Sequence, residues 1–233
     1  MRLGLILPTF RSTPADATDA AAAAGAAGLD GVFCYDHLWP MGSPERPAIA
    51  PFEVLAAVAA RHRGLVVGTL VARVGLVADE VLLSQARALR AVAGDATVIA
   101  LGTGDSKSKD ENLAYGIGFD PPSQRRAELA SIAAALRAEG TEVWIGGGAP
   151  ATREVAVGLG ATLNLWDAAP AEVEAAAARG PVSWAGPFPT AGGRADHAAA
   201  GRLVAALSAA GATWAVFGAP ATVGDVVAAR RAN

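Results

Sequence analysis

The sequence predicts an α/β fold, a (β/α)8 (TIM) barrel, formed as one compact domain over residues 1–233 with few insertions. Three observations predict it. Short runs of β-branched and apolar residues alternate with longer alanine-rich stretches that carry charges at helical spacing. The alternation yields eight strand–helix pairs, the number that a closed parallel barrel needs. No linker, low-complexity block or shift in composition divides the chain.

The expected strands cover residues 3–8, 31–35, 65–71, 97–101, 142–145, 162–166, 182–185 and 214–217, and the expected helices lie near 15–27, 51–62, 78–92, 124–138, 151–158, 170–178, 195–210 and 221–231. Pro51, Pro170 and Pro220 stand where helices should begin, and Gly64 and Gly160 stand where helices should end. An open, doubly wound sheet is the competing architecture. It is disfavoured because no dinucleotide-binding fingerprint follows the first strand.

Composition narrows the classes of function. The chain is 52% hydrophobic, much of it alanine, but it has no apolar run of about 18 residues, so we expect no membrane span. The net charge is −3 and the basic residues are scattered, which argues against a nucleic-acid surface. Cys34 is the only cysteine, so no intramolecular disulfide is possible and a cytoplasmic location is the default. Cys34 itself is expected in the core.

In a barrel of this kind the active site lies where the strands end at their carboxyl side, so the residues there are the candidates. They are Asp36, His37 and Trp39 after the second strand, Gly102, Thr103, Gly104 and Asp105 after the fourth, and Gly146, Gly147, Gly148 and Ala149 after the fifth. The second strand should end near Tyr35, because neighbouring side chains of a strand point to opposite sides. That end would free His37 to turn toward a ligand while Asp36 braces the loop.

The two glycine-rich loops suggest ligand binding. Residues 146–149 run into a helix, and the backbone N–H groups at such a junction bind anions, above all phosphate. A plain strand-to-helix turn also favours glycine, but three glycines in a row are more than a turn needs. Residues 102–104 give a weaker signal, because they would only let a planar ligand approach the backbone.

His37, helped by Asp105, is the candidate acid–base group. The alternative is a strand-end histidine that bonds only to the backbone. A metal site needs three or four converging ligands, and Asp36 and His37 have no suitable partners in the sequence, so no metal is expected. The one long insertion, residues 102–123, is either a lid over the barrel mouth or a surface loop.

Seven motifs occur in order: GLDGVFCYDHLWP, PFEVLAAVAA, LVVGTLV, LLSQARALRAVAG, IALGTGD, ENLAYGIGFDPPSQRRAEL and WIGGGAP. Together they resemble the bacterial luciferase-like monooxygenase superfamily of flavin and deazaflavin enzymes, over residues 1 to about 165. DHLWP and GTGD look most like the branch that uses the deazaflavin coenzyme F420. The fold of that superfamily is the eight-stranded barrel that the alternation also predicts.

The resemblance implies a cofactor in the barrel mouth. His37 and Asp105 match residues near the reactive ring carbon, although the match for Asp105 is more often glutamate, and Trp39 matches a tryptophan that lines the site. A bulge with a non-prolyl cis peptide that supports the ring maps onto Leu70 and Val71. The phosphate loop maps onto residues 146–149, and Asp36 with residues 102–104 completes the expected cofactor-binding set.

The expected function is hydride transfer between coenzyme F420 and an unidentified small organic substrate. An FMN-dependent monooxygenase on the same barrel is the first alternative. A barrel that binds a flavin without catalysis is the second, because the insertion usual near strand seven of this superfamily is missing. The resemblance also implies a homodimer formed through the helices near 51–62 and 78–92.

Overall fold

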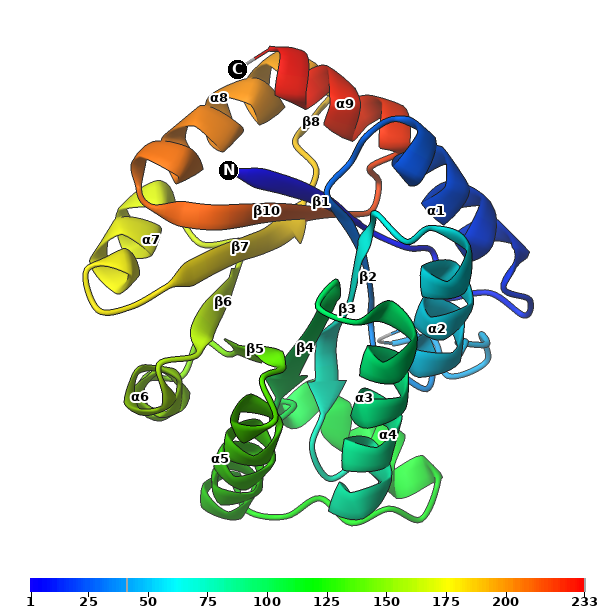
Figure 1. The fold of residues 1–233 in the computed structure, drawn as a ribbon, viewed down its shortest axis with the longest axis vertical. Coiled ribbons are helices and arrows are strands. Elements are labelled where there is room, and N and C mark those ends of the chain that lie inside the picture. Colours follow the sequence, from blue (N-terminus) through cyan, green and yellow to red (C-terminus); the bar gives the residue numbers. More distant parts are fainter. Residues whose placement is uncertain (41, 233) are drawn as a thin grey trace.

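A computed structural model describes residues 1–40 and 42–232 and shows a closed barrel of parallel strands with helices around the outside (Figure 1). Its strands are β1 Arg2–Ile6, β2 Gly31–Cys34, β3 Val66–Arg73, β4 Thr97–Gly102, β5 Glu142–Gly146, β6 Thr162–Trp166, β7 Val182–Pro187 and β10 Ala212–Gly218. They follow one another around the barrel in chain order, and β10 closes it by pairing with β1. The predicted barrel is therefore confirmed, and the open sheet is excluded.

The helices that alternate with these strands are α1 Ala15–Ala26, α2 Pro51–Arg61, α3 Asp79–Ala93, α5 Pro122–Ala138, α6 Pro150–Leu159, α7 Pro170–Ala177, α8 His197–Ala209 and α9 Val223–Arg231. Pro51 and Pro170 begin helices as predicted, whereas α9 begins after Pro220 and is capped by the Thr222 side chain. Among the described residues, no helix has the length and apolar character needed to cross a membrane.

Two connections carry additional elements. The segment between β4 and α5 contains a 3-10 helix, η1 Ser106–Ser108, and a short helix, α4 Lys109–Ala114. The segment between β7 and α8 contains a small antiparallel hairpin, β8 Thr190–Ala191 with β9 Arg194–Ala195. The first of these connections is the long insertion that the sequence predicted, and it contributes to the site described below.

Three aromatic rings fill the barrel interior. Phe33 lies 5.3 Å from Trp144 and 5.5 Å from Trp214, and the two tryptophans are 5.7 Å apart, measured between ring centroids. Rings of this size fit because glycines on the surrounding strands carry no side chain. A Cβ atom on Gly68 would lie 2.9 Å from the Phe33 ring and 2.7 Å from the Val98 carbonyl oxygen. Trp144 and Trp214 are therefore packing residues.

Gly68→Ala tests this arrangement. We expect the added methyl group to lower the free energy of unfolding by about 1–3 kcal/mol, because a packed interior accommodates extra volume only by shifting its neighbours. Urea denaturation followed by circular dichroism measures the change. Gly64→Ala is the matched control, because a Cβ atom at Gly64 meets nothing within 4 Å. Equal stabilities of the two variants would show that the rings do not need this glycine.

Candidate active site

A cavity of about 650 Å³ opens at the carboxyl ends of the strands, within the range typical of small-molecule sites. All the site residues predicted from the sequence line it except Asp36 and Trp39. The predicted residues in the lining are His37, Leu70, Val71, Gly102, Thr103, Gly104, Asp105, Gly146, Gly147, Gly148 and Ala149. The barrel therefore brings four separate chain segments together at one mouth.

The bulge expected at residues 70 and 71 is present within β3. The register between β3 and β4 shifts between Thr69 and Ala72, and the Leu70–Val71 peptide bond is cis. The Val71 side chain sits between two glycines: a Cβ atom on Gly102 or Gly146 would lie 2.5 or 2.6 Å from its methyl groups. Glycine at both positions therefore leaves the space that the Val71 side chain needs to line the cavity.

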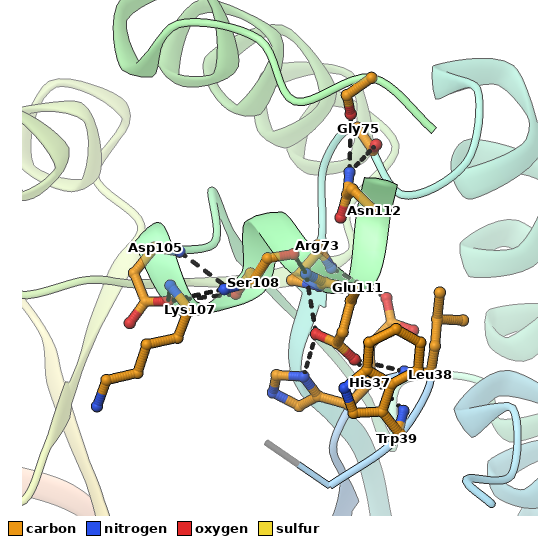
Figure 2. Close-up of polar contacts among 12 residues, drawn as sticks. His37, Leu38, Trp39, Arg73, Gly75, Asp105, Lys107, Ser108, Glu111 and Asn112 are labelled. Atoms are coloured by element: carbon orange, nitrogen blue, oxygen red, sulfur yellow. Dashed lines mark hydrogen bonds and ion pairs between the residues drawn. The ribbon is translucent and has the colours of Figure 1, made fainter. Parts of the chain in front are cut away.

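His37 is held by a carboxylate that the sequence analysis did not select. Strand β2 ends at Cys34, one residue before its expected end, so His37 is outside the strand, and its Nδ1 lies 2.8 Å from Oε2 of Glu111 in α4. The other oxygen, Oε1, accepts a hydrogen bond of 2.7 Å from the backbone N–H of Leu38 (Figure 2). Glu111 therefore fixes both the ring of His37 and the loop that carries it.

Arg73, at the end of β3, completes this cluster. Its Nη1 forms an ion pair of 3.2 Å with Oε2 of Glu111 and donates a hydrogen bond to the Ser108 carbonyl oxygen, whereas its Nε and Nη2 are buried without a hydrogen-bond partner among the described residues. Both side chains are almost fully buried, with Arg73 4% and Glu111 1% exposed.

The Arg73 backbone N–H donates to Oδ2 of Asp36 at 3.0 Å. Asp36 thus joins the ends of β2 and β3 and stands outside the cavity lining, whereas the sequence analysis assigned it to cofactor binding.

The surroundings of Glu111 hold it in its ionised form. Burial by itself would raise the pKa of Glu111, but the hydrogen bond and charge of His37 and the charge of Arg73 lower it below its ordinary value. An ionised carboxylate can only accept, so Nδ1 of His37 donates the hydrogen bond. Nε2 is then the ring nitrogen that remains for a ligand, and His37 lines the cavity.

Asp105 and Trp39, both expected to be catalytic, make contacts that differ from those expected. Asp105 lines the cavity, but its carboxylate caps η1 by accepting hydrogen bonds from the backbone N–H groups of Lys107 at 2.9 Å and Ser108 at 3.2 Å. Glu111, not Asp105, is the carboxylate that contacts His37. Trp39 is buried against Tyr115, with 5.7 Å between ring centroids, and does not line the cavity. Asp105 is held by the helical turn that it caps, whereas His37 and Trp39 contact Glu111 and Tyr115 of the insertion.

The glycine loop of residues 146–149 leads into α6, which begins at Pro150. A Cβ atom on Gly147 would lie 2.9 Å from the Thr152 side chain, so this position has no room for one. Arg153 donates from Nε to the Gly148 carbonyl oxygen at 3.1 Å and pairs with Glu172. The loop therefore lines the cavity with backbone at the start of a helix, the arrangement that suits a phosphate group. Within the described residues, no group of three or more His, Cys, Asp or Glu side chains is placed to hold a metal ion.

Glu111→Gln tests the buried cluster. We expect it to lower the free energy of unfolding by about 3 kcal/mol at neutral pH, because the Arg73 charge loses its buried partner. The folded-state pKa of Glu111 lies below its ordinary value of 4.5, so its stabilisation is complete above pH 4.5 and is lost as the pH falls through the folded-state pKa. The difference in free energy of unfolding between the wild-type protein and Glu111→Gln should therefore become smaller as the pH falls.

Urea titrations of both proteins at several pH values measure this difference. Burial raises the pKa of Asp36, and its hydrogen bond from Arg73 only partly offsets this, so the Asp36 contribution changes with pH in the opposite direction. Because Asp36 is present in both proteins, its contribution largely cancels in the comparison. A difference that stays constant or widens as the pH falls would show that Glu111 is not the stabilising carboxylate.

Comparison with known proteins gives structural matches only. No protein-family model matches the sequence, and no curated protein matches it. An F420-dependent secondary alcohol dehydrogenase, solved with an F420-acetone adduct, superposes with a TM-score of 0.80 at 13% identity over 100% of this chain and 98% of that chain. The coenzyme F420-dependent tetrahydromethanopterin reductase from Methanopyrus kandleri gives 0.73 at 12% identity over 97% and 96%.

A monooxygenase from Streptomyces bottropensis also matches, with a TM-score of 0.66 at 14% identity over 99% of this chain and 97% of that chain. The three matches span almost the whole of each chain, so the likeness is one of complete folds and not of a shared fragment. The chain therefore shares the closed parallel barrel fold of these proteins.

Proposed function

We propose that this protein is an oxidoreductase that binds coenzyme F420 at the barrel mouth and transfers a hydride between it and a small organic substrate. The observation that carries the proposal is the combination, in one cavity, of the bulge at Val71, two glycine loops and a histidine held by a buried carboxylate. The likeness of the fold to two F420-dependent enzymes supports it further.

The residues present fit such a cofactor. Leu70 and Val71 offer a small apolar surface for a planar ring, and the glycines at 102 and 146 leave room for the Val71 side chain that forms part of it. The loop of residues 146–149 at the start of α6 would hold the phosphate. When bound, a deazaflavin supplies the hydride chemistry, while the protein orients it and handles the proton.

His37 is the proposed proton carrier. Its Nδ1 is engaged by Glu111, so a proton is given or accepted at Nε2. The ionised Glu111 stabilises the imidazolium that forms when Nε2 accepts a proton, and it keeps the ring from turning. Arg73 acts through Glu111, because its buried charge favours the ionised carboxylate.

A homodimer through α2 and α3 is part of the proposal, and the outer face of α3 supports it. Leu82, Leu83, Ala86 and Leu89 of this helix are buried toward the barrel. Val81 and Val92 are 47% and 50% exposed, and their spacing places them on one face of the helix. Exposed apolar side chains on the outer face of a helix are what a subunit interface would cover.

Cofactor titration tests the proposed function. We expect coenzyme F420 to bind more tightly than FMN, as measured by the change in cofactor fluorescence. Gly147→Ala should weaken F420 binding by roughly tenfold, because the new Cβ displaces the phosphate loop or Thr152. Gly158→Ala is the matched control, because this glycine lies farther along α6 and a Cβ there meets nothing within 4 Å.

The other outcomes distinguish the alternatives. Tighter binding of FMN than of F420 would favour the flavin monooxygenase, and binding of neither would overturn an oxidoreductase of this type. Equal effects of Gly147→Ala and Gly158→Ala would remove the loop from the cofactor site.

The double variant Val81→Glu/Val92→Glu tests the dimer. We expect the wild-type protein to be a dimer at micromolar concentration in light scattering, and the variant to be a monomer, because two carboxylates would be buried without partners. Ala198→Glu, on the exposed surface of α8, is the control that should leave the dimer intact. A monomeric wild-type protein would contradict this part of the proposal.

A further inference from the structure

Three aromatic side chains form a connected row on the wall of the cavity, and the sequence analysis selected none of them. Phe10 follows β1, Tyr35 follows β2 and Trp166 ends β6. The Phe10 and Tyr35 rings are stacked, with centroids 5.8 Å apart and an interplanar angle of 14°, and the Trp166 ring lies 6.1 Å from Tyr35. All three residues line the cavity, so the row is one surface built from three strand ends.

A glycine on the neighbouring strand makes room for this row. A Cβ atom on Gly218, at the end of β10, would lie 2.8 Å from the Tyr35 hydroxyl oxygen and 3.7 Å from the Trp166 ring. The two rings therefore pack down onto the end of β10. The Tyr35 hydroxyl is uncharged at neutral pH, and burial raises its pKa further, to about 12. The row is thus a neutral aromatic wall.

Trp166 is the open member of the row. Its side chain is 53% exposed, although an indole is among the largest apolar groups that a protein can bury. Trp39 and Tyr115, by contrast, pack against each other outside the cavity. Large exposed apolar surface at the rim of a cavity is typical of a ligand-binding surface. Because Trp166 belongs to the cavity lining, a ligand in the cavity can cover it.

We propose that Phe10, Tyr35 and Trp166 form the substrate subsite and that the site takes substrates with a planar aromatic ring, which stacks on Trp166. This inference rests on the proposed function, because it assigns the surface at Leu70 and Val71 to the cofactor ring and leaves the aromatic row for the substrate. An aromatic ring gains more from a stacked or edge-to-face partner than a saturated ring of the same size does.

A matched pair of probes tests the subsite. Calorimetric titrations compare 2-naphthol with its fully saturated analogue, decahydro-2-naphthol, in the presence of saturating coenzyme F420. We expect 2-naphthol to bind roughly 3- to 10-fold more tightly. Trp166→Ala should abolish this preference and Trp166→Phe should restore part of it. Tyr115→Ala, which removes an exposed aromatic ring outside the cavity, should leave it unchanged.

Three results would overturn the inference. Equal binding of the two probes to the wild-type protein would remove the aromatic subsite, and so would a preference that persists in Trp166→Ala. Mutual displacement of 2-naphthol and coenzyme F420 would assign the row to the cofactor ring. If neither F420 nor FMN binds, the proposed function fails by itself, and a preference for 2-naphthol that depends on Trp166 would still support the aromatic subsite.

Discussion

The organisation of the barrel mouth depends on one buried carboxylate. Glu111 contacts His37 and Leu38 after β2 and Arg73 at the end of β3, and it belongs to the insertion between β4 and α5. A buried charge is costly unless it is paired and hydrogen-bonded, so the loss of one of these contacts makes the buried carboxylate less favourable. Asn112, the next residue, ties the insertion to the chain after β3 by donating to the Gly75 carbonyl oxygen at 3.0 Å (Figure 2).

This dependence explains how an insertion can complete a site built on a rigid barrel. The strand ends provide the bulge at Val71 and the loop at Gly147, which are held by packing against the barrel. The insertion adds the group that orients His37 and covers Arg73. Functional side chains are generally held in one geometry by packing and hydrogen bonds from neighbouring residues. In the proposed function, the barrel would position the ligand, and Glu111 would position His37 as the proton carrier.

Most of the fold was predictable because parallel strands buried on both faces leave a strong local signal. The expected boundaries of β6 coincide with those observed, and β2 ends one residue before its expected end at Tyr35. The two glycine-rich loops could also be identified from the sequence. The structure shows that Gly102 and Gly146 are required by the close approach of Val71. The hairpin after β7 left no such signal, because its strands are only two residues long.

The partner of His37 was not predictable by the same reasoning. Asp105 stands directly at a strand end, but N–H groups two and three residues later satisfy its carboxylate, as is common for aspartate before a helical turn. Glu111 reaches His37 only because the fold places α4 beside the ends of β2 and β3, which depends on tertiary structure. The same holds for the two tryptophans: Trp166 ends a strand and faces the cavity, whereas Trp39 is covered by Tyr115 from the insertion.

If Glu111 engages Nδ1 of His37, then Nε2 is the nitrogen that a bound cofactor meets. The most direct measurement is the nitrogen-15 NMR spectrum of the labelled histidine rings, with the His37 signals assigned by their loss in His37→Gln. We expect the neutral ring to carry its hydrogen on Nδ1, and the addition of coenzyme F420 to shift the Nε2 signal. A hydrogen on Nε2, or a His37 spectrum that F420 leaves unchanged, would contradict this account of the site.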